Sequence, residues 1–211
     1  MSRAVTTRPK RTTMRPKRTP ACLATRLLQL FLLVGLMWAC EIVDQVAAAD
    51  LDQFGIQPRS LSHWYGILLS PFLHAGFAHL ITNTGILLTL GILVALITSQ
   101  FFAVTASIIV LGGAGVWLFG PAGTVHVGAS GLIYGYAAFL IVFGFSARRL
   151  APTIVGIIVA CIYGGMAWGV LPNQMGISWQ AHLFGAIAGV YVARHLGHRL
   201  RSNKKTPKRF F

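Results

Sequence analysis

Long apolar segments, separated by short breaks rich in glycine, proline or polar residues, dominate this chain. Charged residues are missing from Ser60 to Ala147 and again from Leu150 to Ala193. A membrane-spanning helix needs about 20 mainly apolar residues, and breaks of this kind are typical of the connections between helices. The pattern predicts six spans, at residues 23–46, 77–98, 101–120, 128–147, 151–171 and 177–195.

The connection between the first two predicted spans is long and partly apolar. It runs over residues 49–76 and contains the aromatic run Trp64–Leu69, which is too short to cross a bilayer. Aromatic rings favour the interface between lipid and water. We therefore expect an all-α membrane protein, a bundle of six transmembrane helices with an interfacial loop between helices 1 and 2.

Composition and charge agree with this class of protein. Charged residues make up 10% of the chain, against roughly 25% in an ordinary soluble domain. A net charge of +14 also suggests nucleic-acid binding, but the charges follow the expected topology. Apart from Arg59, every basic residue falls on the side that holds both termini, which the positive-inside rule makes cytoplasmic. The four acidic residues lie near the outer end of the first span: Glu41, Asp44, Asp50 and Asp52.

We therefore expect a multi-pass protein of a bacterial plasma membrane, with cytoplasmic termini that meet lipid headgroups and not nucleic acid. The expected organisation is a disordered basic tail at residues 1–20, a membrane domain at 21–197 and a second basic tail at 198–211. A cleaved signal peptide is an alternative interpretation of the first 49 residues, although Glu41 and Asp44 interrupt the approach to its cleavage site. The three cysteines have neither disulfide nor metal-ligand spacing.

Polar residues recur at one depth in the predicted bundle. With the N-terminus inside, the second, fourth and sixth spans all begin at the outer face. His79 and Asn83 share one helical face at the start of the second span, Ser130 opens the fourth, and His182 lies early in the sixth. Polar groups in lipid are costly unless they are paired, so their meeting indicates a functional site.

The chemistry available to these residues is that of a serine nucleophile and a histidine base. Small residues flank both, and the Gly131/Gly135 and Gly185/Gly189 pairs allow two helices to approach closely. No acidic residue follows Asp52, so a carboxylate cannot orient the histidine, and we expect a Ser–His dyad with Tyr134 as the nearest supporting residue. The candidate oxyanion donors are His79, Asn83 and the backbone N–H of Ser130.

Other interpretations of these residues remain open. Ser130 is also suited to a packing seam, His182 to a core hydrogen bond, and Asn83 to a contact between helices. A metal site is a further alternative, because histidine is a good zinc ligand and three histidines are available: His74, His79 and His126. However, the spacing of the first two does not place them on one helical face, and no cysteine or carboxylate joins them. We expect neither a metal nor another cofactor.

Taken together, the motifs closely resemble the rhomboid family of intramembrane serine proteases. The matching pieces are Phe72–Leu80 with Asn83, then Gly128-Ala129-Ser130-Gly131 with Tyr134, then Ala181-His182 with Gly185 and Gly189, which span most of the chain. The resemblance implies a six-helix fold with Ser130 as nucleophile and His182 as base. It also implies that His79, Asn83 and the Ser130 N–H form the oxyanion hole, and that Tyr134 packs on the His182 ring.

The same resemblance implies cleavage of single-span membrane proteins near one end of their transmembrane helix. A mobile lid is expected around residues 169–178. Two rivals remain: a rhomboid-like protein that binds membrane helices without cleaving them, and a transporter with a polar relay. A rhomboid-like binding protein usually lacks the serine or the histidine. A transporter needs polar residues that continue toward the cytoplasmic ends of the spans. The natural substrate, the pathway and the oligomeric state are not fixed by the sequence.

Overall fold

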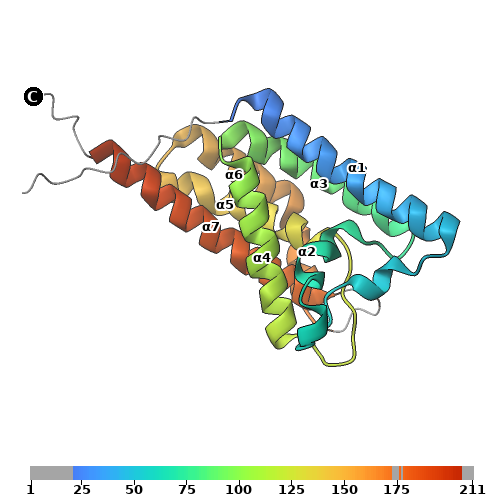
Figure 1. Cartoon of the computed structure of the whole chain (residues 1–211). Helices are drawn as coiled ribbons and strands as arrows, with labels where there is room; N and C mark the ends of the chain where they lie inside the picture. The colour runs from blue at the N-terminus through green and yellow to red at the C-terminus, as the bar shows by residue number, and fades with distance from the viewer. Residues whose placement is uncertain (1–20, 173–175, 177, 206–211) are drawn as a thin grey trace, which may run out of the picture.

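The computed structural model describes residues 21–172, 176 and 178–205, and its regular structure is helical throughout this part of the chain (Figure 1). The predicted N-terminal tail therefore lies outside the described residues. Short 3₁₀ turns connect several helices. The α-helices are α1 (Leu23–Ala47), α2 (Gly66–Leu69), α3 (Phe77–Ile97), α4 (Phe101–Phe119), α5 (Ser130–Ala147), α6 (Leu150–Tyr163) and α7 (Trp179–Lys205).

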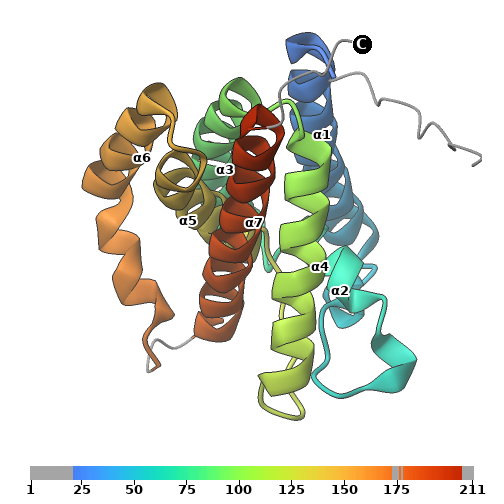
Figure 2. The same ribbon diagram turned by 90° about the vertical axis from the view of Figure 1, so that its left-hand side faces the viewer.

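Helix α5 is the central helix, because it packs on α3, α4, α6 and α7. Helix α7 packs most extensively on α5 and also along α4, so that Figure 2 shows it between these two helices. Helix α6 packs on the other side of α5, while α1 pairs with α3 at the far edge of the molecule. This arrangement fixes the relative positions of the N-terminal ends of α3, α5 and α7, which carry the predicted site residues.

Glycines set the close approach of α5 and α7. A Cβ atom added to Gly185 would lie 2.0 Å from the carbonyl oxygen of Gly131, and one added to Gly189 would lie 2.1 Å from that of Gly135. No side chain fits at either position, so the two backbones touch, as in other small-residue seams between membrane helices. The sequence predicted this close approach from the spacing of the four glycines.

Five helical segments have the length and apolar character of membrane spans. They are Leu23–Ala47, Phe77–Ile97, Phe101–Phe119, Ser130–Ala147 and Leu150–Val170, the last formed by α6 and the 3₁₀ segment Gly164–Val170. These five agree with the first five predicted spans to within about two residues. Large apolar side chains face outward on them, including Phe31, Leu32, Phe102 and Ile162. Such an apolar exterior is that of an integral membrane protein.

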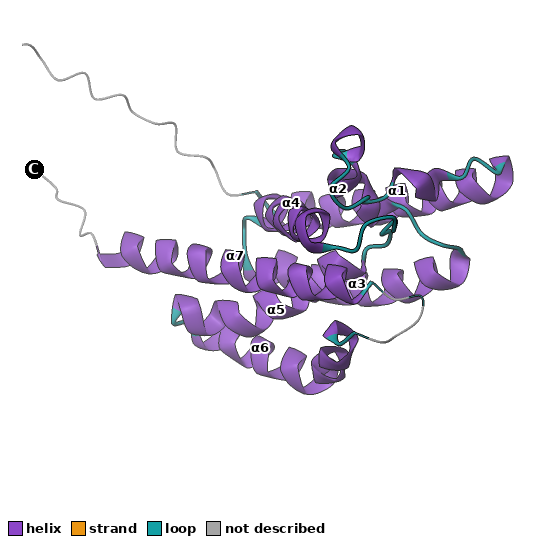
Figure 3. Cartoon of the chain, turned by 90° about the horizontal axis from the view of Figure 1, so that it is seen from below, coloured by secondary structure: helices purple, strands orange, loops and turns teal. Residues whose placement is uncertain are grey.

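The sixth predicted span, residues 177–195, falls on α7, which is less apolar than the others. Gln180, His182 and Arg194 interrupt its hydrophobic sequence. The helix also continues past the predicted boundary at residue 197 to Lys205 (Figure 3). Gly197 lies within the helix, where a Cβ atom would come 2.6 Å from Ser146 Cβ of α5. The predicted C-terminal tail therefore begins as helix, and its last residues, 206–211, lie outside the described part.

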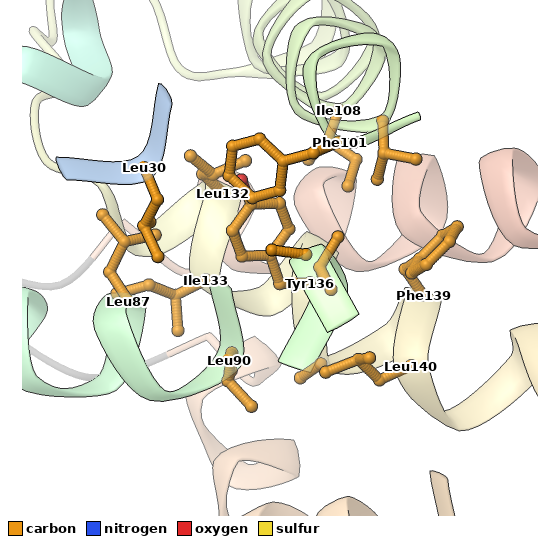
Figure 4. Packing of buried hydrophobic residues seen from close by; sticks show 14 of the residues in the cluster. Leu30, Leu87, Leu90, Phe101, Ile108, Leu132, Ile133, Tyr136, Phe139 and Leu140 are labelled. Carbon is orange, nitrogen blue, oxygen red and sulfur yellow. The ribbon is translucent and has the colours of Figure 1, made fainter. Parts of the chain in front are cut away.

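The core between α1, α3, α4 and α5 is mainly apolar and includes a buried polar contact between Tyr136 and Thr105. Figure 4 shows Phe101, Ile108, Tyr136 and neighbouring leucines converging there. The Tyr136 hydroxyl is fully buried and lies 2.6 Å from Thr105 Oγ1. A buried hydroxyl needs such a partner, since leaving it unpaired costs about 1–3 kcal/mol.

Backbone contacts join the connection after α1 to the connection between α4 and α5. Ile56, in the connection after α1, forms an antiparallel bridge with His126, in the connection between α4 and α5. Arg59 donates to the carbonyls of Leu118 and Gly120 at the end of α4, where a cation complements the helix dipole. The predicted interfacial segment therefore rests against the loop that leads into α5.

Candidate active site

A single cavity of about 1090 Å³ brings the predicted site residues together. Its lining includes Ser130 and Tyr134 from α5, His79 and Asn83 from α3, and His182 from α7. The N-terminal ends of three helices thus contribute to one polar space, although the residues are as much as 103 positions apart in the sequence (79 to 182). A cavity with a few convergent polar groups is the usual form of a binding or reaction site.

Ser130 is the first residue of α5 and is half-buried in the cavity wall. The first N–H groups of a helix have no acceptor within the helix, so its backbone can donate to a ligand. Gly128, two residues earlier, has φ of 110° and donates its N–H to the carbonyl of Ser70. A Cβ atom there would lie 2.7 Å from His79 Cε1. Only glycine therefore allows this turn to lie against the His79 ring.

The His182 ring is buried, and one of its nitrogens is hydrogen-bonded to the backbone. Nδ1 lies 2.8 Å from the carbonyl oxygen of Gly169. Because a carbonyl only accepts hydrogen bonds, Nδ1 must carry the proton, and the neutral ring then has its lone pair on Nε2. This tautomer can take a proton at Nε2, which is the task of a general base.

Tyr134 packs on the face of the His182 ring. The Tyr134 and His182 rings are stacked, with centroids 4.0 Å apart and planes inclined by 8°. The Tyr134 hydroxyl donates to the carbonyl of Met166, 2.9 Å away. A Cβ atom at Gly169 would lie only 1.9 Å from that hydroxyl and 3.2 Å from His182 Nδ1. The 3₁₀ segment after α6 therefore fixes both rings.

Ser130 and His182 line the same cavity without a hydrogen bond between them in the described structure. Hydrogen bonds of catalytic groups are often long without substrate and tighten when it binds. Gly131, next to Ser130, packs on the backbone of Ala181, next to His182. The two helix starts are therefore in contact at this level.

Asn83 brings an unpaired donor to the cavity. The side chain is only 5% exposed, and its Nδ2 atom has no hydrogen-bond partner among the described residues. A buried donor without a partner costs about 1–3 kcal/mol, so such groups in a folded protein call for an explanation. An anionic oxygen in the cavity would supply the missing acceptor.

His74, which the sequence raised only as a metal ligand, supports the turn before Ser130. Its Nε2 accepts the N–H of Ala129 at 3.4 Å, and its ring lies edge-on to that of His79 with centroids 5.1 Å apart. Burial, with a smaller contribution from the neighbouring His79, lowers the pKa of His74 to about 4. The ring is therefore neutral near pH 7, as an acceptor nitrogen requires.

His126 and Ser178 form a second contact that the sequence did not predict. His126 Nδ1 lies 2.7 Å from Ser178 Oγ, and its Nε2 lies 2.9 Å from Thr124 Oγ1. Ser178 Oγ in turn accepts the N–H of Ala181, in the geometry of a helix N-cap. A serine just before an apolar helix is a recognisable cap in a sequence, but its partner His126 has no sequence pattern that would reveal it.

The metal alternative finds no support in the described residues, which contain no group of three or more His, Cys, Asp or Glu side chains placed to hold an ion. The predicted lid at residues 169–178 falls partly outside the described residues, at 173–175 and 177.

Comparison with known proteins gives matches to one family and to several individual proteins. Residues 61–199 match the Rhomboid domain family. The uncharacterized protein Rv1337 of Mycobacterium tuberculosis is 43% identical over 169 residues, which cover 76% of this chain and 70% of that protein. Two proteins of Bacillus subtilis are more distant. The putative rhomboid protease YdcA is 30% identical over 62% of this chain and 66% of its own length. The rhomboid protease GluP is 28% identical over 68% of this chain and 29% of its own length.

Proposed function

The chain belongs to the rhomboid family, and on that premise we propose that it is an intramembrane serine endopeptidase that uses a Ser130–His182 dyad. The observation that carries the proposal is the shared cavity. It holds a serine hydroxyl, a histidine whose Nε2 has no hydrogen bond to a described residue, and an asparagine amide nitrogen without an acceptor among the described residues. These are the nucleophile, the base and an oxyanion donor that acyl transfer requires.

In the proposed reaction, His182 Nε2 takes the proton of Ser130 Oγ as that oxygen attacks the scissile carbonyl. The carbonyl oxygen becomes an oxyanion and accepts hydrogen bonds from Asn83 Nδ2, the His79 ring and the Ser130 N–H. The protonated His182 then gives its proton to the leaving amine, and the C–N bond breaks. Water attacks the acyl-enzyme with His182 as base again, which releases the new carboxyl group and restores Ser130.

A carbonyl takes the place that a carboxylate occupies in a Ser–His–Asp triad. The chain has only four acidic residues, all at or before Asp52. The Gly169 carbonyl selects the Nδ1–H tautomer of His182, and Tyr134 fixes the plane of the ring. These neutral contacts orient the base without placing a further charge in the membrane, where charges are costly.

The substrates we propose are single-span membrane proteins. A helical substrate hides its carbonyls in hydrogen bonds to residue i+4, so its helix must unwind locally before Ser130 can reach one. We further propose α7 as the sixth span, both termini in the cytoplasm and the cavity near the outer face of a bacterial plasma membrane. The proposed reaction uses only side chains of this chain and water, with neither a metal nor another cofactor.

The test is cleavage of a model single-span substrate in proteoliposomes. Wild type, Ser130→Ala and His182→Ala are compared, with Ser62→Ala and His195→Ala as matched controls at exposed positions. We expect one defined cleavage product from wild type and both controls, and none from the two dyad variants. Substrate binding without cleavage by wild type would favour a helix-binding rhomboid relative. Equal processing by wild type and Ser130→Ala would remove the dyad.

A further inference from the structure

A hydrogen-bonded contact joins the loop that carries the proposed nucleophile to the helix that carries the proposed base. His126 precedes Ser130 by four residues, and Ser178 precedes His182 by four. The side chains of His126 and Ser178 meet at 2.7 Å. No other pair of side chains in the described structure hydrogen-bonds between the α4–α5 connection and the start of α7.

The hydrogen bonds around His126 have one consistent direction. The Thr124 hydroxyl donates to the carbonyl of Pro121, so it must accept from His126 Nε2–H. The neutral His126 ring then has its lone pair on Nδ1, which accepts the Ser178 hydroxyl proton. Every donor proton in this series of hydrogen bonds has an acceptor, including the Ala181 N–H, which donates to Ser178 Oγ. A serine that both caps a helix and donates to histidine is fixed in one rotamer.

Both ends of this series of hydrogen bonds are held by the backbone. The His126 backbone exchanges two hydrogen bonds of 2.9 Å with Ile56, and its side chain is 7% exposed. Burial lowers the pKa of His126, so the ring is neutral near pH 7, as the direction of its hydrogen bonds requires. At the other end, the Ser178 carbonyl accepts the N–H of His182 itself. The first turn of α7, and with it the His182 ring, is thus held from outside its own helix.

We propose that His126 is a positioning residue which, through Ser178, sets the place of His182 relative to Ser130. This inference rests on the proposed function for its catalytic consequence, although the anchoring is a property of the fold alone. A displacement of about 1 Å in a reacting group can cost on the order of 100-fold in rate. The loss of one anchoring hydrogen bond is therefore expected to lower kcat and to leave KM nearly unchanged.

The experiment compares His126→Phe, Ser178→Ala and the double variant in the proteoliposome assay. His126→Phe keeps an aromatic ring and removes both side-chain hydrogen bonds. His195→Phe, an exposed histidine farther along α7, is the matched control. We expect each single variant to lose about 10-fold in kcat, with KM within about twofold. The double variant should be no slower than either single one, because both remove the same contact.

A conservative variant separates positioning from a general loss of structure. His126→Asn places a polar group near the position of Nδ1 and can still pair with Ser178, so it is expected to recover most of the lost kcat. Ser178→Thr keeps both the cap and the hydroxyl and should also stay close to wild type. Additive losses in the double variant, or a loss explained entirely by a lower folded fraction, would overturn the inference.

Hydrogen exchange gives a readout that does not depend on activity. In His126→Phe and Ser178→Ala, the amides of Ala181 and His182 should exchange about 10-fold faster than in wild type and in His195→Phe. Unchanged exchange and unchanged kcat would refute the role of His126. If wild type itself cleaves no faster than Ser130→Ala, the proposed function fails, and the exchange rates alone decide whether His126 anchors α7.

Discussion

The imidazole of His182 lies flat on the phenol ring of Tyr134, 4.0 Å away. Both rings also bond to the same 3₁₀ segment, Gly164–Val170: Tyr134 donates to the Met166 carbonyl, and His182 donates to that of Gly169. A ring held on its face and at one nitrogen has little freedom to tilt. The segment after α6 is therefore part of the site through these two carbonyl groups, and its Met166 also lines the cavity.

Substitution of Gly169 tests this arrangement. In Gly169→Ala the new Cβ atom would lie 1.9 Å from the Tyr134 hydroxyl, so one of the two rings must move. We expect kcat to fall by about 10- to 100-fold, measured on the model substrate. Gly165→Ala is the matched control, because a Cβ atom there meets nothing within 4 Å. Equal activities of the two variants would show that the stacked pair does not set the rate.

Asn83 is expected to matter for rate and not for stability. Asn83→Ala removes a proposed oxyanion donor, which typically costs about 100-fold in kcat, although the remaining donors can soften the loss. It also removes a buried amide nitrogen that has no hydrogen-bond partner among the described residues, so the thermal unfolding midpoint should stay the same or rise. A variant that unfolds earlier and keeps full kcat would assign Asn83 a packing role instead.

The α5–α7 seam makes a prediction about stability. A Cβ atom at Gly189 would lie 2.1 Å from the Gly135 carbonyl oxygen, so Gly189→Ala must push the two helices apart. Overpacking of this kind costs about 1–3 kcal/mol, and the thermal midpoint in detergent should fall. Gly35→Ala, where a Cβ atom meets nothing within 4 Å, should have no such effect. If the two variants unfold alike, the glycine contact is not a stabilising feature.

The pKa of His74 predicts a loss of stability in acid. Burial lowers its folded pKa to about 4, whereas the unfolded value is about 6.5. Between these values the unfolded chain binds more protons, so the free energy of unfolding falls as pH drops from about 6.5 to 4 and gains no further change from this group below that. Unfolding midpoints at pH 7 and pH 4.5 should differ more for wild type than for His74→Gln. An equal difference would remove His74 as a source of the effect.

The sequence predicted what periodicity and charge control. The first five spans, the shared face of His79 and Asn83, and the glycine seam follow from residue type and spacing alone. Spacing could not reveal the Gly169 carbonyl, because any residue offers a carbonyl and only the packing of α6 brings this one to His182. The same holds for His126, whose partner is 52 positions away. The sequence did not predict that α7 continues past residue 197, because the basic residues there suggested a solvated tail.

The central claim is that Ser130 is a nucleophile activated by His182, and covalent labelling measures it most directly. A fluorophosphonate probe reacts when the serine oxygen displaces fluoride from phosphorus and the base takes the proton. Mass spectrometry of the labelled membrane protein should place the adduct on Ser130, with no adduct on that peptide in Ser130→Ala and labelling at least about 100-fold slower in His182→Ala. Labelling of another residue, or equal rates in wild type and His182→Ala, would contradict the account.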